Sequence, residues 1–89
     1  MKAARIDANQ PAIVDALRTC GASVQSLAPV GGGVPDLLVG HRGINYLFEV
    51  KTKKGKLTDP QVDWHDAWRG QVIIIRTIED ALRIIGVIS

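Results

Sequence analysis

Three charged side chains lie in segments whose neighbours are apolar. Asp36 precedes one apolar run, and Glu49 and Lys51 lie in a second run that begins at Ile44. One or two carboxylates, completed by waters and substrate phosphate, are the usual ligands of Mg²⁺. A bound divalent ion lowers the pKa of an attacking water and neutralises phosphate charge during phosphodiester hydrolysis. The residue types therefore predict a hydrolytic metal site at Asp36 and Glu49, with Lys51 placed to orient the water or stabilise the pentavalent phosphate.

A structural interpretation of the same residues stays open. Two carboxylates a few ångströms apart near a core repel each other unless a cation lies between them. Alternatively, Asp36 only begins a strand after a Gly-Pro turn, and Glu49 and Lys51 form an exposed pair on an edge strand. The pattern is short, so the residue types alone do not decide between a metal site and a structural role.

A β-hairpin is expected to position the two carboxylates. Residues 36–40 and 44–52 have the composition of strands, and the intervening His41-Arg42-Gly43 is typical of a tight turn. Alternation along the second strand places Glu49 and Lys51 on the same face of the sheet. The opposite face is expected to carry Ile44, Tyr46, Phe48 and Val50.

The other elements are expected to surround this hairpin. They are a helix over residues 7–20, a strand over 23–30, a helix after Thr58, a strand over 71–77 and a closing helix after Thr77. The continuous apolar character of 71–77 predicts a strand covered on both faces. The order is αβββαβα, an α/β fold with one mixed sheet, and residues 1–89 are expected to form a single domain.

Composition excludes several other classes of protein. Hydrophobic residues make up 46% and charged residues 22% of the chain, which is ordinary globular usage. Cys20 is the only cysteine, so an internal disulfide and a cysteine-rich zinc site are excluded. The longest uncharged apolar run, 72–75, is far shorter than the roughly 20 residues that span a bilayer. A soluble intracellular protein is expected.

The basic residues are concentrated next to the candidate site, although the net charge of +2 is too small to indicate nucleic acid by itself. Lys53, Lys54 and Lys56 follow Lys51 directly. They form either a solvated loop or a surface that contacts backbone phosphates on both sides of the scissile one. The weaker candidates for DNA contact are Arg42, His41 and Arg5.

Two helices begin with a glutamine on their apolar stripe. Gln10 and Gln61 each have an alternative role in a capping box, with Asp7 and Thr58 as the respective N-caps. Trp64 and Trp68 have helical spacing and are expected in the core, and His65 beside them is expected to be structural or at the surface. Neither glutamine is assigned to the site by spacing alone.

Taken together, three motifs resemble the VRR-NUC (virus-type replication-repair nuclease) domain of the PD-(D/E)xK superfamily. They are Gly33-Val34-Pro35-Asp36, Glu49-Val50-Lys51-Thr52, and Gly55-x-Leu57-Thr58-x-x-Gln61 followed by Trp64. The match is strong over residues 31–70, and the flanking elements fit the same αβββαβ core. The resemblance implies a restriction-endonuclease-like fold and a metal-dependent DNA endonuclease.

The resemblance also assigns roles to individual residues. It implies that Asp36, Glu49 and the backbone carbonyl of Val50 bind Mg²⁺ or Mn²⁺, that Lys51 assists the water, and that Gln61 joins the site from its helix. The family often carries a further acidic residue on the first helix. Here Asp7 or Gln10 is the candidate for that place, and a capping role for Gln61 can coexist with one at the site.

Substrate and partners are implied only by the family. Small stand-alone members suggest a homodimer that cuts branched DNA such as Holliday junctions or flaps, in the cytoplasm of a bacterium or a phage-infected cell. No membrane and no small-molecule cofactor are expected. The alternative is a non-catalytic nucleic-acid-binding or assembly module with the same fold. The intact set of Asp36, Glu49, Lys51 and Gln61 favours the nuclease.

Overall fold

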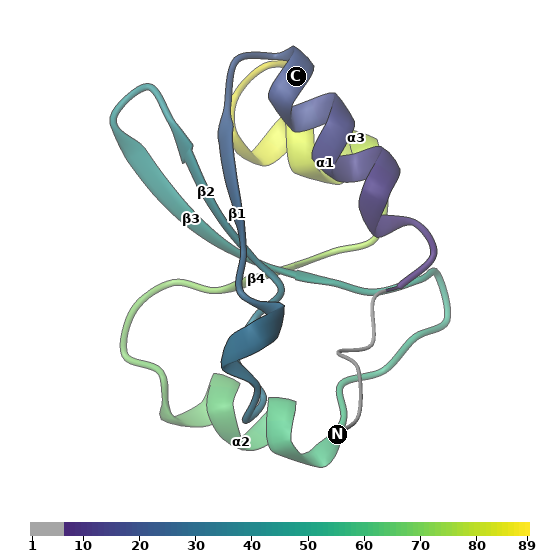
Figure 1. Cartoon of the computed structure of the whole chain (residues 1–89), viewed down its shortest axis with the longest axis vertical. Coiled ribbons are helices and arrows are strands. Elements are labelled where there is room, and N and C mark those ends of the chain that lie inside the picture. Colours follow the sequence, from purple (N-terminus) through teal and green to yellow (C-terminus); the bar gives the residue numbers. More distant parts are fainter. Residues whose placement is uncertain (1–6) are drawn as a thin grey trace.

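A mixed four-stranded sheet organises the chain, in a computed structural model that describes residues 7–89 (Figure 1). The elements in order are α1 (Gln10–Thr19), β1 (Ser23–Ser26), the 3-10 helix η1 (Ala28–Val30), β2 (Leu37–His41), β3 (Ile44–Val50), α2 (Asp59–Ala67), β4 (Ile73–Ile75) and α3 (Ile78–Ile84). The strands lie in the order β1-β2-β3-β4; β1, β2 and β3 are antiparallel, and β4 is parallel to β3. The expected αβββαβα order is confirmed.

The β2–β3 hairpin sets the register that matters for the candidate site. Its two-residue turn has positive φ at Arg42 (51°) and Gly43 (78°), as a type I′ turn requires. Leu37 pairs with Phe48, so Asp36, one residue before β2, lies across from Glu49. The predicted hairpin is therefore confirmed, although β2 lies one residue later than expected and β3 ends two residues earlier.

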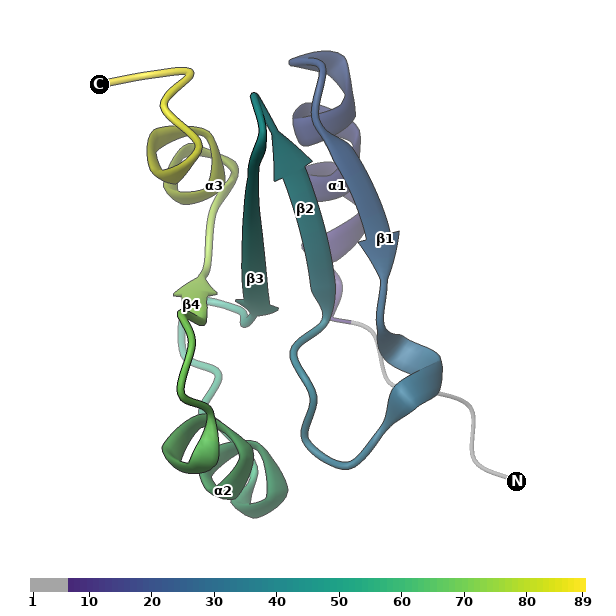
Figure 2. The same cartoon turned by 90° about the vertical axis from the view of Figure 1, so that its left-hand side faces the viewer.

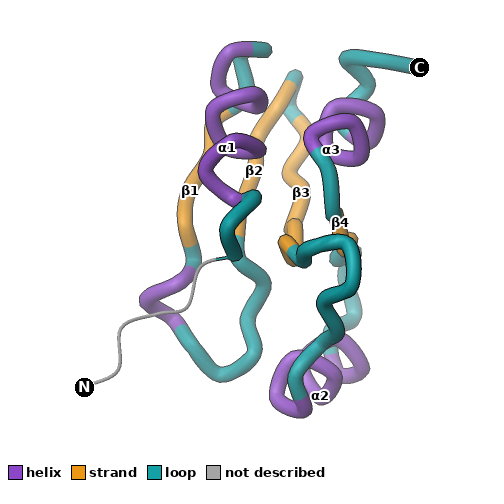
Figure 3. The backbone as a smooth tube through the Cα atoms, turned by 90° about the vertical axis from the view of Figure 1, so that its right-hand side faces the viewer, coloured by secondary structure: helices purple, strands orange, loops and turns teal. Residues whose placement is uncertain are grey.

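Helices α1 and α3 cover one face of the sheet (Figures 2 and 3). Alternate β3 residues Phe48 and Val50 point into this layer and are almost fully buried, as the period of two predicts. The core cluster consists of Ile13, Leu17, Ala22, Leu37, Val39, Phe48, Val50, Ile75, Ala81 and Ile85. Glu49 and Lys51 consequently belong to the other face, which α1 and α3 leave uncovered.

Two expected strands outside the hairpin are shorter in the structure. The strand expected over 23–30 ends at Ser26, because Pro29 has no amide hydrogen for a strand ladder and lies in η1 instead. The strand expected over 71–77 pairs only over Ile73–Ile75. It lies at the edge of the sheet, and Ile74 is 38% exposed, so the expectation of cover on both faces is wrong. Among residues 7–89, no helix is long and apolar enough to cross a membrane.

The first helix also differs from its expected form. It begins at Gln10 rather than at residue 7, and its N-cap is Asn9, whose side chain makes no capping hydrogen bond. The expected capping box of Asp7 and Gln10 is therefore wrong. Asn9 instead uses its Nδ2 to donate to the carbonyls of Lys51 (3.0 Å) and Arg76 (2.9 Å), which ties the start of α1 to the ends of β3 and β4.

Helix α2 stands apart from the other two helices, at the end of the sheet where β3 ends (Figure 1). Thr58 caps it as expected, but none of its side chains is fully buried. Trp64 and Trp68 stack on each other at 4.7 Å between ring centroids, and Trp68 is 45% exposed, so the core role expected for them is wrong. The helix instead approaches the sheet through Gly33, where a Cβ would collide with the carbonyl of Pro60.

Candidate active site

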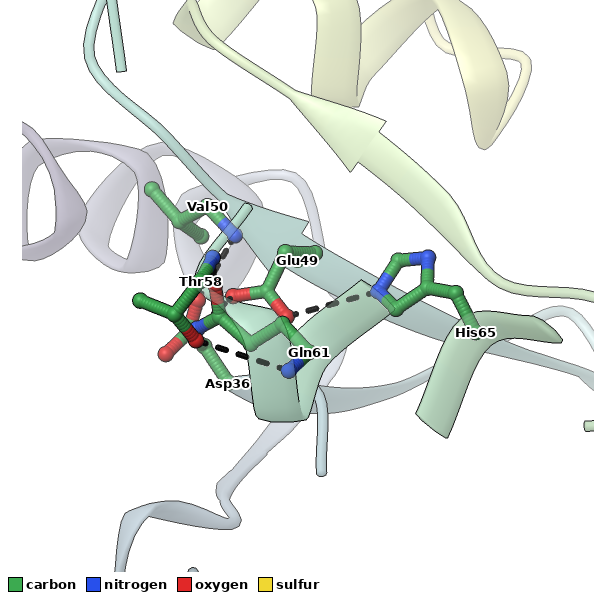
Figure 4. Close-up of polar contacts among 6 residues, drawn as sticks. All are labelled: Asp36, Glu49, Val50, Thr58, Gln61 and His65. Atoms are coloured by element: carbon green, nitrogen blue, oxygen red, sulfur yellow. Dashed lines mark hydrogen bonds and ion pairs between the residues drawn. The ribbon is translucent and has the colours of Figure 1, made fainter. Parts of the chain in front are cut away.

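A pocket of about 330 Å³ lies between the end of β3 and the start of α2. Its lining residues are Asp7, Asp36, Glu49, Val50, Lys51, Gly55, Lys56, Thr58 and Gln61. Segments far apart in the sequence therefore meet here: the N-terminal turn, the hairpin, the loop after β3 and α2. Most of the residues that the sequence singled out share this pocket (Figure 4).

Asp36 is fixed by the backbone of the neighbouring strand. Its Oδ2 accepts a hydrogen bond of 2.7 Å from the Val50 amide, and the preceding Pro35 is fully buried. A short bond from an amide to a carboxylate holds that carboxylate in one orientation. No nitrogen of the described residues donates to the second oxygen of Asp36, which leaves that oxygen to the neighbouring Glu49 carboxyl or to a cation.

Glu49 is buried with an exposed fraction of 0%. Burial, together with a hydrogen bond to the Asp36 carboxyl and the charges of Asp36 and Asp7, raises its pKa from 4.5 to about 9, while the charge of Lys51 lowers it. Glu49 therefore holds a proton at neutral pH when no cation is present. Asp36 and Glu49 thus share a proton in one pocket. A cation can bind between the two carboxyl groups by displacing that proton.

This donor set fits a hard divalent ion with an open coordination sphere. Within residues 7–89, no group of three or more His, Cys, Asp or Glu side chains is arranged to hold a metal. A closed protein cage is therefore absent from the described part of the chain. Mg²⁺ rarely needs such a cage, because it usually keeps waters and binds substrate phosphate beside one or two carboxylates. Asp36 and Glu49 are two carboxylates of this kind, and Val50 lines the same pocket.

Gln61 has both of the roles that the sequence left open. Its Oε1 accepts from the Thr58 amide (2.8 Å), which completes the capping box, and its Nε2 donates to Glu49 Oε2 (3.4 Å). Because the cap occupies the oxygen, the amide nitrogen must face the carboxylate. The cap of α2 thus orients a donor toward Glu49.

His65 lies closer to the site than the sequence analysis expected. Its Nε2 is 3.5 Å from Glu49 Oε1, and only 13% of its side chain is exposed. Burial lowers the pKa of His65, which favours the neutral ring. The surface position is therefore wrong, whereas the structural role stays a prediction. One signal could have placed His65 near the site: Gln61 and His65 are four residues apart and share a helix face.

We expect His65→Ala to weaken Mn²⁺ binding by about tenfold, because loss of a partner that orients a metal ligand commonly costs 10- to 100-fold and this contact is long. His65→Gln retains a donor and should recover much of the affinity. Calorimetric titration with Mn²⁺ measures both variants, with exposed Asp63→Ala on the same helix as the control. Affinity of His65→Ala equal to that of the unmodified chain would contradict a role in holding Glu49.

Lys51 completes the pocket from the same face of β3 as Glu49. Its side chain is buried, yet no carboxylate of the described residues lies within 4 Å of its ammonium, since the ion pairs there are His65–Glu49 and Arg83–Asp80. Its amide donates to the Ile75 carbonyl at 3.0 Å. The backbone is therefore fixed, while the charge remains unpaired and able to bind a phosphate oxygen.

The basic residues that the sequence suggested for DNA contact lie at different distances from the pocket. Lys56 lines the pocket, and Lys53 and Lys54 are exposed on the turn before it. Arg42 occupies the hairpin turn at the opposite end of β3, roughly 20 Å from Glu49 at about 3.3 Å per residue. Arg5 lies outside the described residues.

Asp7 and Gln10, the two candidates for a further site residue near the first helix, differ in position. Asp7 lines the pocket and its charge helps raise the pKa of Glu49. Gln10 is buried, does not line the pocket, and has an Oε1 without a hydrogen-bond partner in the described part of the chain. Of the two, only Asp7 has the position that a site residue needs.

Comparison with known proteins identifies the fold. No family model matches the chain, and no curated protein matches it. Among solved structures, one described as "VRR_NUC domain" is similar, with a TM-score of 0.68 and 26% sequence identity over 85% of this chain and 88% of that chain. The match agrees with the order of the three motifs, and the chain has the fold of a VRR-NUC domain, a nuclease-like α/β fold.

Proposed function

We propose that the chain is a Mg²⁺- or Mn²⁺-dependent endodeoxyribonuclease whose single domain comprises residues 1–89. One observation supports this function above the others: Glu49 is buried beside Asp36 with a pKa raised to about 9, an arrangement that a bound cation relieves. The VRR-NUC fold makes phosphodiester hydrolysis the reaction that such a site serves.

Each side chain of the pocket has a defined task in this proposal. Asp36, Glu49 and the Val50 carbonyl would hold the ion, and a bound ion would lower the pKa of the attacking water and neutralise charge on the phosphate. Lys51 binds a non-bridging oxygen of the scissile phosphate, where its charge stabilises the pentavalent transition state. Gln61 and His65 keep the Glu49 carboxylate in place through its two oxygens. Asp7 adds negative charge that favours a bound cation.

The lysines after β3 are proposed to bind the DNA backbone. Lys56 is at the pocket and would contact the phosphate next to the scissile one, and Lys53 and Lys54 would contact phosphates further along the strand. Arg42 is far from the pocket and would contribute only if the DNA extends along the hairpin. These contacts provide affinity without sequence preference.

Branched DNA as substrate and a homodimer as the active form are further parts of the proposal. The described residues offer surface for DNA mainly at the pocket and at the lysines after β3. Two copies related by a two-fold axis would double that surface and supply two cuts. Sedimentation of the protein tests this part: a monomer that still resolves four-way junctions would contradict the dimer. The proposed location is the cytoplasm of a bacterium or a phage-infected cell.

We expect cleavage of labelled DNA in Mg²⁺ or Mn²⁺ and none in EDTA, because the ion supplies the activated water. Four-way junction, flap, nicked and linear duplexes should be compared, and the branched substrates should be cut fastest. Cutting in EDTA would overturn the mechanism. Binding without cutting in either metal would instead support the alternative, a non-catalytic nucleic-acid-binding or assembly module with this fold.

A further inference from the structure

Arg76, which follows β4, directs its guanidinium into the loop that leaves β3. Its Nη1 donates to the carbonyls of Thr52 (2.7 Å) and Gly55 (2.8 Å), with a longer contact to that of Lys53 (3.4 Å). We call residues 52–56 the lysine loop, since Lys53, Lys54 and Lys56 lie in it. A single side chain from a distant part of the sequence thus binds three carbonyls of this loop.

Little else in the described part of the chain holds the lysine loop. It contains one internal hydrogen bond, from the Gly55 amide to the Thr52 carbonyl (3.0 Å), and no other side chain of residues 7–89 bonds to its backbone. The three lysines are exposed and carry like charges. Like charges on an unanchored loop favour extended and variable conformations, so Arg76 is the main constraint on where these lysines lie.

Arg76 is itself anchored to the elements that position the site. Its amide donates to Asp80 Oδ2 (2.9 Å) in the cap of α3, and its carbonyl accepts from Asn9 Nδ2 (2.9 Å). The same Asn9 nitrogen binds the carbonyl of Lys51 (3.0 Å). The lysine loop is thereby held in fixed relation to Lys51 and to the pocket.

The choice of residue at position 76 supports a positioning role. Arginine adds a positive charge beside four lysines, which is unfavourable by itself. The planar guanidinium compensates because it directs several donors to carbonyls in a fixed geometry, whereas an ammonium on a flexible chain does so less well. Since Nη1 is occupied by carbonyls, this side of Arg76 is committed to the loop and not to an external phosphate.

We propose that Arg76 is a positioning residue for nucleic-acid binding, which holds Lys53, Lys54 and Lys56 in line with the pocket. The inference rests on the proposed function, in which these lysines bind DNA phosphates. Arg76→Met should weaken duplex binding in EDTA by about tenfold, and should lower the slope of log K against log salt by more than the roughly 0.9 expected for one lost phosphate contact. Arg76 thus acts on DNA through the three lysines.

A double-mutant cycle tests this coupling. Arg76→Met is combined with the triple variant Lys53→Ala, Lys54→Ala, Lys56→Ala, and duplex affinity is measured in EDTA by fluorescence anisotropy. If Arg76 acts through the lysines, its replacement has almost no further effect in the triple variant. Additive effects would overturn the proposal, because they indicate that Arg76 contacts DNA itself. Arg83→Met, which removes an exposed arginine of α3, is the matched control and should retain the affinity.

A second measurement does not depend on DNA. Limited trypsin digestion should cut after Lys53 and Lys54 at least about tenfold faster in Arg76→Met than in Arg83→Met, because cleavage requires local opening of the loop. Unchanged cleavage would overturn the positioning role of Arg76 and would leave the proposed function unaffected. Faster cleavage combined with undiminished DNA affinity of the triple lysine variant would overturn the DNA-binding part of the proposed function, and the positioning role with it.

Discussion

Lys51→Ala is expected to reduce DNA cleavage by about a thousandfold at saturating Mn²⁺, near the upper end of the 10²- to 10³-fold loss that follows removal of one preorganised donor to a developing oxyanion. The ammonium lies beside Glu49 with no carboxylate partner in the described residues, so its charge is available to the transition state rather than to an ion pair. Single-turnover cleavage of a labelled junction measures the rate, and anisotropy in EDTA measures binding.

DNA binding should change much less than cleavage in this variant. Lys51 is one of several cations near the pocket, and removal of one phosphate contact lowers the salt slope by only about 0.9. Arg69→Ala is the control, because Arg69 is exposed after α2 and does not line the pocket. Undiminished cleavage by Lys51→Ala would refute the mechanism, and an equal loss of binding and cleavage would reduce Lys51 to a DNA-binding role.

The geometry around Asp36 and Glu49 was largely predictable from local sequence. Alternation along β3 fixes which side chains share a face, and the two-residue turn at Arg42-Gly43 fixes the hairpin register. Together they place Asp36 across from Glu49. The capping box of Thr58 and Gln61 was also predictable, because its residues lie within one helical turn.

Contacts between distant segments were not predictable in this way. Arg76 reaches the carbonyl of Thr52 across 24 residues, and His65 reaches Glu49 across 16. The Arg76 contact leaves no periodic pattern, because the approach depends on how whole elements pack. For His65 the sequence offers only its spacing of four residues from Gln61, which places both on one helix face but does not show what that face contacts. Long-range packing also explains the failure at β4, whose apolar residues 72–75 predict a covered strand although Ile74 at the sheet edge is 38% exposed. A resemblance between sequences supplied the role of Gln61 but not its contact with Glu49.

Asp36→Asn is expected to abolish Mn²⁺ binding and to lower cleavage at least about a thousandfold, since one of two carboxylate ligands is lost. The fold should survive, because an asparagine Oδ1 can still accept the hydrogen bond of the Val50 amide. The substitution also removes the negative charge that opposes ionisation of Glu49. We therefore expect the metal-free variant to melt at the same temperature as the unmodified chain at pH 6 and at a higher temperature at pH 8.

The sign of this pH dependence follows from Glu49. Its folded pKa of about 9 lies above its ordinary 4.5, so between these values the folded state retains a proton that the unfolded state has lost. The metal-free protein thus loses stability as pH rises through this window, by up to about 1.4 kcal/mol per pH unit. Asp36→Asn removes the contribution of Asp36 to the raised pKa of Glu49 but leaves burial, which is the largest cause. The loss of stability with rising pH should therefore be smaller in this variant, but it should not disappear.

Thermal unfolding from pH 6 to pH 9, in EDTA and in Mn²⁺, separates the two outcomes. In the unmodified chain, Mn²⁺ should raise the melting temperature more at pH 8 than at pH 6, because the ion must displace the Glu49 proton. In Asp36→Asn, Mn²⁺ should have no effect at either pH. Asp63→Asn, an exposed change on α2, is the control and should behave like the unmodified chain. A large loss of stability in metal-free Asp36→Asn at pH 8, where removal of the Asp36 charge should favour the fold, would show that Asp36 is structural.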